Sequence, residues 1–118
     1  MRLLLIFLAF GLAATLSFST TAQANGCRYF SYVQYGTVMY GGNPQDMRKG
    51  FRVGPVRKTA GNTSASSASG IINIGPFDSE SALILERSLA VDDVKAQGYV
   101  RSGNFTFPGV VIHKQKDC

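Results

Sequence analysis

Tryptophan is absent from this 118-residue chain, and the sequence has only one His and two Cys. A zinc cluster of Cys and His needs about four such ligands, so this class of metal site is excluded. A Ser/His/Asp relay would have to use His113, the only histidine, and the sequence does not place a Ser and an Asp beside it. Gly41 and Gly42 are not followed by the Lys and Ser or Thr of a phosphate-binding loop. We therefore predict a protein that is not an enzyme, with no catalytic residue, metal or cofactor.

Long apolar runs are also scarce. The longest, residues 3–16, falls short of the roughly 20 residues of a membrane-spanning helix. Arg2 precedes it, and Ala22 and Ala24 provide the small side chains that a signal peptidase accepts. The pattern predicts a signal peptide over residues 1–24, export to the periplasm or the medium, and no membrane span in the mature chain. A lipidated Cys27 is the alternative, although the preceding Ala-Asn-Gly fits a lipobox poorly.

The two cysteines stand at the ends of the mature chain, residues 25–118, as Cys27 and Cys118. In an oxidising compartment such a pair is expected to form a disulfide. Closing so long a loop contributes on the order of 4 kcal/mol in the chain-entropy model. Two free thiols in a reducing compartment are the alternative, which the predicted signal peptide argues against.

Several segments have clear local preferences. Residues 28–40 are rich in aromatic and β-branched side chains and predict a strand, as do residues 71–77. Residues 41–44 predict a turn, and residues 44–49 a turn or two of helix. Residues 59–70 are rich in Ser and Ala and predict a mobile loop within the single domain.

A longer helix is predicted between residues 79 and 98. Asp78 or Ser79 provides the N-cap, and Gly98 ends the helix. The spacing of three and four residues predicts one buried stripe of Ala82, Leu85 and Leu89. The helix carboxylates are expected to form a solvated face.

The order of these elements predicts an α+β fold. It matches a small ferredoxin-like split βαβ sheet of about four strands with one main helix. In that plan the first and last strands pair antiparallel. The pairing would place Cys27 beside Cys118, so strand order and cysteine placement support each other.

Three short motifs resemble those of a known family. They are Tyr-Val-Gln-Tyr-Gly-Thr at 32–37, Gly-Phe-Arg-Val at 50–53 with Pro-Val-Arg at 55–57, and Ile-Asn-Ile-Gly-Pro-Phe-Asp-Ser-Glu-Ser-Ala at 72–82 before Gly-Tyr at 98–99. Over residues 31–101 the chain is similar to SPOR domains, the small peptidoglycan-binding modules of bacterial cell envelopes. The resemblance implies binding of peptidoglycan glycan.

A binding surface is predicted in the basic half of the chain. Residues 25–60 hold six basic and one acidic residue and four of the five tyrosines. If Val33 and Ile74 face the helix, the alternation of a strand places other side chains on an open sheet face. The predicted ligand-binding residues are Tyr32, Gln34, Arg52, Arg57 and Asn73.

This composition suits several partners. Tyrosine rings pack on sugar faces, and Gln, Asn and Arg bind hydroxyl and acetamido groups. The basic cluster Arg48, Lys49, Arg52, Arg57 and Lys58 suits an anionic polymer or an acidic envelope or host protein. We predict a non-catalytic exported binding module for cell-wall glycan. The alternative is a small secreted interaction or effector protein that binds a host or bacterial protein. Nucleic acid is a third, less favoured partner. The remaining alternative is that the charges belong to an ordinary surface and the tyrosines to the core, with no role in binding.

Overall fold

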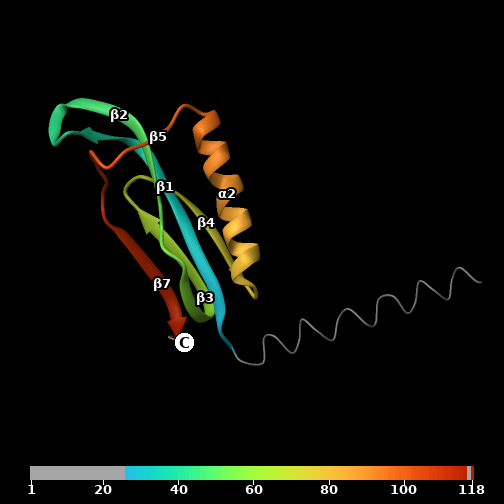
Figure 1. The fold of residues 1–118 in the computed structure, drawn as a ribbon. Helices are drawn as coiled ribbons and strands as arrows, with labels where there is room; N and C mark the ends of the chain where they lie inside the picture. The colour runs from blue at the N-terminus through green and yellow to red at the C-terminus, as the bar shows by residue number, and fades with distance from the viewer. Residues whose placement is uncertain (1–25, 117) are drawn as a thin grey trace, which may run out of the picture.

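One mixed sheet of seven strands and one helix make up the part of the chain that the computed structural model describes, residues 26–116 and 118 (Figure 1). The predicted signal peptide, residues 1–24, lies outside the described residues. The strands are β1 (Arg28–Tyr40), β2 (Asn43–Val53), β3 (Arg57–Ser67), β4 (Gly70–Phe77), β5 (Val100–Arg101), β6 (Phe105–Thr106) and β7 (Val110–Lys116). The helix, α2 (Glu80–Ala96), lies between β4 and β5 in the sequence.

Strand β1 is the centre of the sheet and has the bounds predicted for it. Val33 pairs with Val53 of β2 on one edge and with Ile72 of β4 on the other. At the two ends of β1, β3 continues the β2 edge and β6 continues the β4 edge. Residues 30–34 are all buried, because both edges and both faces of this strand are covered.

The two faces of β1 bury separate apolar clusters. On one face Val33 and Phe51 pack against Val94 of α2. On the other face Phe30 and Tyr32 pack against Ala65 of β3, with Val110 and Ile112 of β7 beside them. Helix α2 and the β3–β7 ribbon therefore sandwich the sheet, as Figure 1 shows.

The predicted ferredoxin-like fold is wrong. The sheet has seven strands rather than about four, and the last strand, β7, pairs with β3 and not with β1. Residues 44–49 form no helix but belong to β2, where Arg48 pairs with Val38. The reason lies in Gly41 and Gly42, whose φ angles of 63° and 69° allow the tight turn of a β-hairpin. The turn sends the chain straight back along β1.

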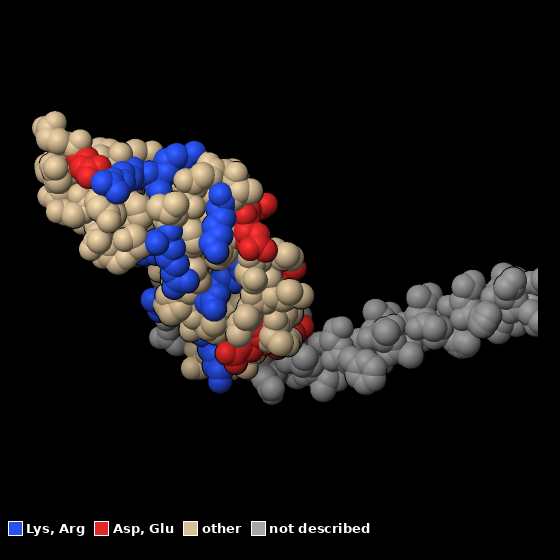
Figure 2. Space-filling model, turned by 45° about the horizontal axis from the view of Figure 1, so that its top comes forward, with Lys and Arg blue, Asp and Glu red and all other residues tan. Residues whose placement is uncertain are grey.

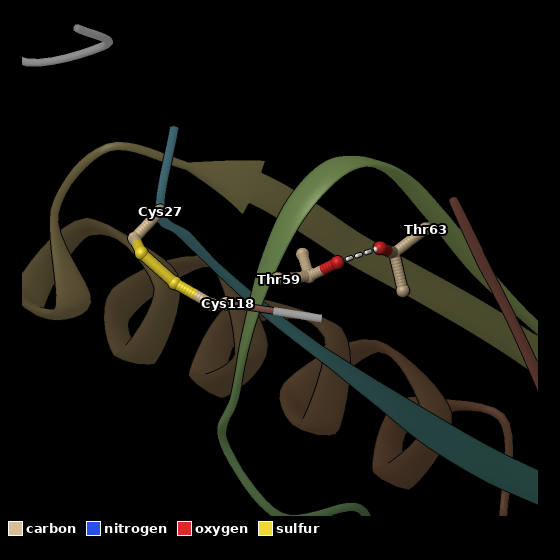
Figure 3. Close-up of a disulfide and its surroundings, with 4 residues drawn as sticks. All are labelled: Cys27, Thr59, Thr63 and Cys118. Carbon is tan, nitrogen blue, oxygen red and sulfur yellow. Dashed lines mark hydrogen bonds between the residues drawn. A yellow bond between two sulfur atoms is a disulfide. The ribbon is translucent and has the colours of Figure 1, made fainter. Parts of the chain in front are cut away.

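The predicted loop at residues 59–70 is largely strand β3. Thr59, Thr63 and Ala65 are buried, while the residues between 63 and 67 alternate in exposure as in a half-buried strand. Small side chains let β3 lie close against the aromatic rings of β1. Where the pairing of β3 with β7 is irregular, Thr59 Oγ1 and Thr63 Oγ1 are hydrogen-bonded at 2.5 Å (Figure 3).

The predicted disulfide is confirmed: Cys27 and Cys118 are bonded, with their Cα atoms 5.6 Å apart (Figure 3). The route to it differs from the predicted one. The start of β3 lies between the two chain ends, because Thr59 pairs with Arg28 and Ala60 with Lys116. The bridge therefore joins β1 to β7 across β3.

Helix α2 begins at the predicted cap, where the Ser79 hydroxyl accepts a hydrogen bond from the backbone N–H of Ala82 at 3.1 Å. The predicted buried stripe is wrong: Leu85 is 61% and Leu89 52% exposed. Leu83 and Val94 are buried instead. Arg87 favours this rotation, because its Nη1 donates to the carbonyl of Gly54 at 2.8 Å.

Candidate functional site

A row of aromatic rings lies where the β1–β2 hairpin meets the segment that returns along β6. Tyr40 ends β1 and packs edge-on against Phe105, with ring centroids 5.3 Å apart. Phe105 in turn packs edge-on against Phe107 at 6.0 Å. All three rings are half-buried. The row depends on Gly50, since a Cβ there would lie 2.8 Å from the Phe105 ring.

Two exposed arginines of β2 flank this row. The guanidinium carbon of Arg48 lies 3.7 Å from the centroid of the Tyr40 ring. That of Arg52 lies 5.0 Å from the centroid of the Phe107 ring. Cations over aromatic faces are attracted by the ring quadrupole. We call these five residues, Tyr40, Arg48, Arg52, Phe105 and Phe107, the arginine–aromatic surface.

Arg52 is held in place from beneath. Its Nε donates to Gln34 Oε1 at 2.6 Å. Gln34 Nε2 in turn lies 2.8 Å from the carbonyl of Pro108, next to Phe107, and 2.9 Å from the Ser67 hydroxyl. Gln34 is fully buried. The amide therefore fixes the arginine relative to the ring, and the two Arg52 Nη atoms make no hydrogen bond to a described residue.

Arg48 is held by a carboxylate. Its Nε donates to Asp46 Oδ1 and its Nη2 to Asp46 Oδ2, each at 2.9 Å. This bidentate pair lowers the pKa of Asp46 and raises the pKa of Arg48, with the hydrogen bonds between them as the main cause. The pair keeps the guanidinium over Tyr40 but neutralises part of its charge.

The other basic residues of this half lie mostly on the same sheet. Lys49 Nζ donates to the carbonyl of Gln97 at 2.6 Å and lies 4.6 Å from the Tyr99 ring centroid. Arg101 of β5 is exposed. Figure 2 shows blue Lys and Arg atoms spread over one face, with most red Asp and Glu atoms along its right-hand side. An anionic ligand is therefore attracted toward the face that carries these basic residues.

The predicted binding residues do not form one open face. Tyr32 is only 7% exposed and packs with Phe30 and Ala65. The Asn73 side chain accepts from the backbone N–H of Ala65 at 2.7 Å and donates to its carbonyl at 3.3 Å. The face predicted to be open is covered by the β3–β7 ribbon and the segment around Pro108.

Of the five predicted residues, Arg52 and Gln34 come together, with Gln34 behind the surface rather than on it. Arg57 is exposed on β3, apart from them in the sheet register. Three residues of the arginine–aromatic surface, Tyr40, Phe105 and Phe107, were not singled out by the sequence. The alternation of Phe-Thr-Phe before Pro108 was the signal for rings on one side of an extended chain.

Three further features of the described residues concern catalysis, metal binding and membrane spans. His113 Nε2 lies 3.0 Å from the Ser66 hydroxyl, and both side chains are exposed. Among residues 26–116 and 118, no group of three or more His, Cys, Asp and Glu side chains is placed to hold a metal ion. In the same residues no helix has both the length and the apolar character to cross a membrane.

No family model, no curated protein and no solved structure matches this chain.

Proposed function

We propose that this chain is an exported, non-catalytic binding module that binds cell-wall glycan through the arginine–aromatic surface. Its ligand would be peptidoglycan, whose sugars present apolar ring faces and whose stem peptides present carboxylates. The observation that carries the proposal is the pairing of two exposed arginines with aromatic rings. One of these arginines, Arg52, is fixed by the buried amide of Gln34.

Export is supported by two features. The N-terminal run with Ala22 and Ala24 has the pattern of a signal peptide. The Cys27–Cys118 disulfide is of the kind that persists in oxidising compartments such as the periplasm and the medium. The resemblance to SPOR domains suggests the bacterial cell wall as the destination.

The surface chemistry suits this ligand. Half-buried rings such as Phe107 are rigid and lose little conformational entropy when a sugar face packs on them. A guanidinium presents several donors in one plane and can bind a carboxylate through two hydrogen bonds. Because Arg52 is already oriented by Gln34, binding requires less ordering of this side chain.

Sedimentation with purified peptidoglycan sacculi tests the proposal. The disulfide-bonded mature protein is expected to pellet with sacculi at low salt and to be released as salt screens the arginines. The double variant Arg48→Gln/Arg52→Gln is expected to weaken binding about tenfold or more, as loss of central arginines does at other binding surfaces. The variant Phe107→Leu keeps an apolar side chain but loses the ring, and it should bind more weakly than the wild type.

A charge-matched control is Arg57→Gln/Arg101→Gln, which removes the same charge outside the surface. It should bind sacculi nearly as well as the wild type. If the wild-type protein stays in the supernatant at low salt, glycan binding is wrong. If both double variants lose binding equally, general charge and not the arginine–aromatic surface is responsible. A mobility shift of single-stranded DNA without sacculus binding would indicate nucleic acid as the ligand.

A further inference from the structure

A groove of about 460 Å³ lies between β4 and α2, and β4 pairs with the edge of β1 opposite to the edge that pairs with β2. Residues 72–75 of β4 and Phe77 line one wall, and Leu89 and Ala90 of α2 line the other. Leu89 is 52% exposed, so the groove presents an apolar side chain to solvent. None of the residues of the arginine–aromatic surface lines this groove.

The groove runs beside an unpaired strand edge. Strand β4 pairs with β1 along one edge, and no strand among the described residues pairs with the other edge. In an edge strand, alternate backbone N–H and C=O groups point outward without a ladder partner. An extended segment of another chain could therefore add to β4 by backbone hydrogen bonds while its side chains enter the groove.

The groove is bordered by negative charge. Glu86, Asp92 and Asp93 of α2 belong to its lining, and none of them forms an ion pair with a residue in the described part of the chain. Three neighbouring carboxylates repel one another, and a cationic side chain placed among them would relieve the repulsion. A second copy of the chain paired two-fold through β4 would instead bring two such acidic borders together.

We propose that this groove is a docking site for an extended, Lys- or Arg-containing segment of a partner protein, which adds as a strand to the free edge of β4. Apolar side chains of the segment would pack on Leu89 and the wall formed by Ile72. Its cations would pair with Glu86, Asp92 and Asp93. The site is independent of glycan binding. It fits the alternative function predicted from the sequence, that of a small exported interaction protein.

Fluorescence anisotropy with defined peptides tests this proposal. The probe is a labelled peptide as long as β4 that alternates Lys and Val, and the comparison peptide alternates Glu and Val. The disulfide-bonded protein is expected to bind the Lys/Val peptide and not the Glu/Val peptide. N-methylation of alternate backbone nitrogens on the pairing edge of the Lys/Val peptide should abolish binding, because it removes the donors that a strand addition needs.

Two pairs of variants on α2 give matched controls. Leu89→Lys places a bulky cation in the groove and should weaken peptide binding about tenfold, whereas Leu85→Lys, at a neighbouring exposed position outside the groove, should not. Glu86→Gln removes one carboxylate of the border and should weaken binding about threefold, whereas Glu80→Gln should leave it unchanged. All four positions are exposed, so folding should be retained, which circular dichroism checks.

Any of the following three outcomes would overturn the proposal. If the Glu/Val peptide binds as well as the Lys/Val peptide, the charge argument is wrong. If the N-methylated peptide binds normally, strand addition is wrong. If the wild-type protein forms a dimer that Leu89→Lys dissociates, the occupant is a second copy. Sacculus binding by Leu89→Lys should equal that of the wild type, which separates failure here from failure of the glycan proposal.

Discussion

Gln34 is fully buried at the middle of β1 and joins four other parts of the chain through its amide. Its Nε2 reaches the Ser67 hydroxyl of β3, the Ser69 hydroxyl before β4 and the carbonyl of Pro108 before β7. Its Oε1 accepts from Arg52 of β2. A buried amide with all its partners present is stabilising, but removing it leaves several polar groups without partners.

Replacing Gln34 with leucine is therefore expected to lower the free energy of unfolding by about 2–4 kcal/mol. Urea denaturation followed by circular dichroism measures this change. Gln45→Leu is the control, because Gln45 is exposed in β2, and its effect should stay within about 0.5 kcal/mol. Equal effects of the two substitutions would contradict the role of the Gln34 amide.

Asp46 limits the charge that Arg48 can offer to a ligand. Because the bidentate pair lowers the pKa of Asp46, the carboxylate stays ionised until the pH falls below its ordinary range. Any stabilisation from the pair is present above the unfolded-state pKa of Asp46 and is lost as the pH falls through the lower, folded-state value. Arg48 is therefore held by Asp46 throughout the neutral range.

Asp46→Asn removes this restraint and one negative charge beside the arginine–aromatic surface. We expect the variant to bind sacculi about two- to fivefold more tightly than the wild type at low salt, with the difference shrinking at high salt. Asp78→Asn, which removes a carboxylate near Arg28 instead, is the control and should change binding less. Weaker binding by Asp46→Asn would mean that holding Arg48 over Tyr40 matters more for binding than the charge that Asp46 neutralises.

At the scale of elements, strand β3 shows how tertiary packing can order a segment that composition marks as a loop. Its two Thr residues favour a strand, but its Ala, Gly and Asn residues do not. The segment becomes a strand because Ala65 packs on Phe30 and Tyr32, and because β7 pairs along the outer edge. Neither partner is near β3 in the sequence.

Ala65→Leu tests whether β3 is packed as the structure has it. The larger side chain has no room between β3 and the rings of β1, so we expect a loss of about 1–3 kcal/mol in the free energy of unfolding. Ser64→Leu, one residue earlier on the exposed side of the strand, should change it by less than about 0.5 kcal/mol. In a mobile loop, both substitutions would be equally harmless.

The sequence was informative where a local signal was strong. The aromatic and β-branched residues of β1 and the Ser79 cap of α2 were predicted correctly. The rotation of α2 was not, because Leu85 and Leu89 carry the apolar spacing, while burial follows Leu83, Val94 and the contact of Arg87 with Gly54. Of the candidate site, Arg48 and Arg52 were found through local charge. Its rings were not, because Tyr40 and Phe105 are brought together by the return of the chain along β1.

At the scale of the whole molecule, the two proposed binding regions lie on opposite sides of the sheet and have opposite charge. Strands β2, β3 and β5 together hold six basic residues and one acidic residue, whereas α2 holds four acidic and two basic residues. An anionic polymer and a cationic peptide would thus approach different sides without competing. Such a module could bind the cell wall and hold a partner protein there at the same time.

The disulfide connects the parts on which both regions depend. Cys27 and Cys118 close a loop with a sequence separation of 91 residues, and in the chain-entropy model such a bridge stabilises the fold by roughly 4 kcal/mol. It also fixes the end of β7, which covers the second apolar cluster of the sheet through Val110 and Ile112. A small domain with a limited core depends heavily on such a link.

We therefore expect Cys27→Ser/Cys118→Ser to lower the free energy of unfolding by about 3–5 kcal/mol, as measured by urea denaturation. The wild type under reducing conditions should be destabilised to a similar degree, and the double variant should not respond to reductant. Loss of β7 packing should expose the rings of Phe30 and Tyr32 and increase binding of an apolar dye. If the oxidised wild type and the double variant are equally stable, the bridge contributes nothing to the fold, and the ribbon of β3 and β7 must be held by its packing alone.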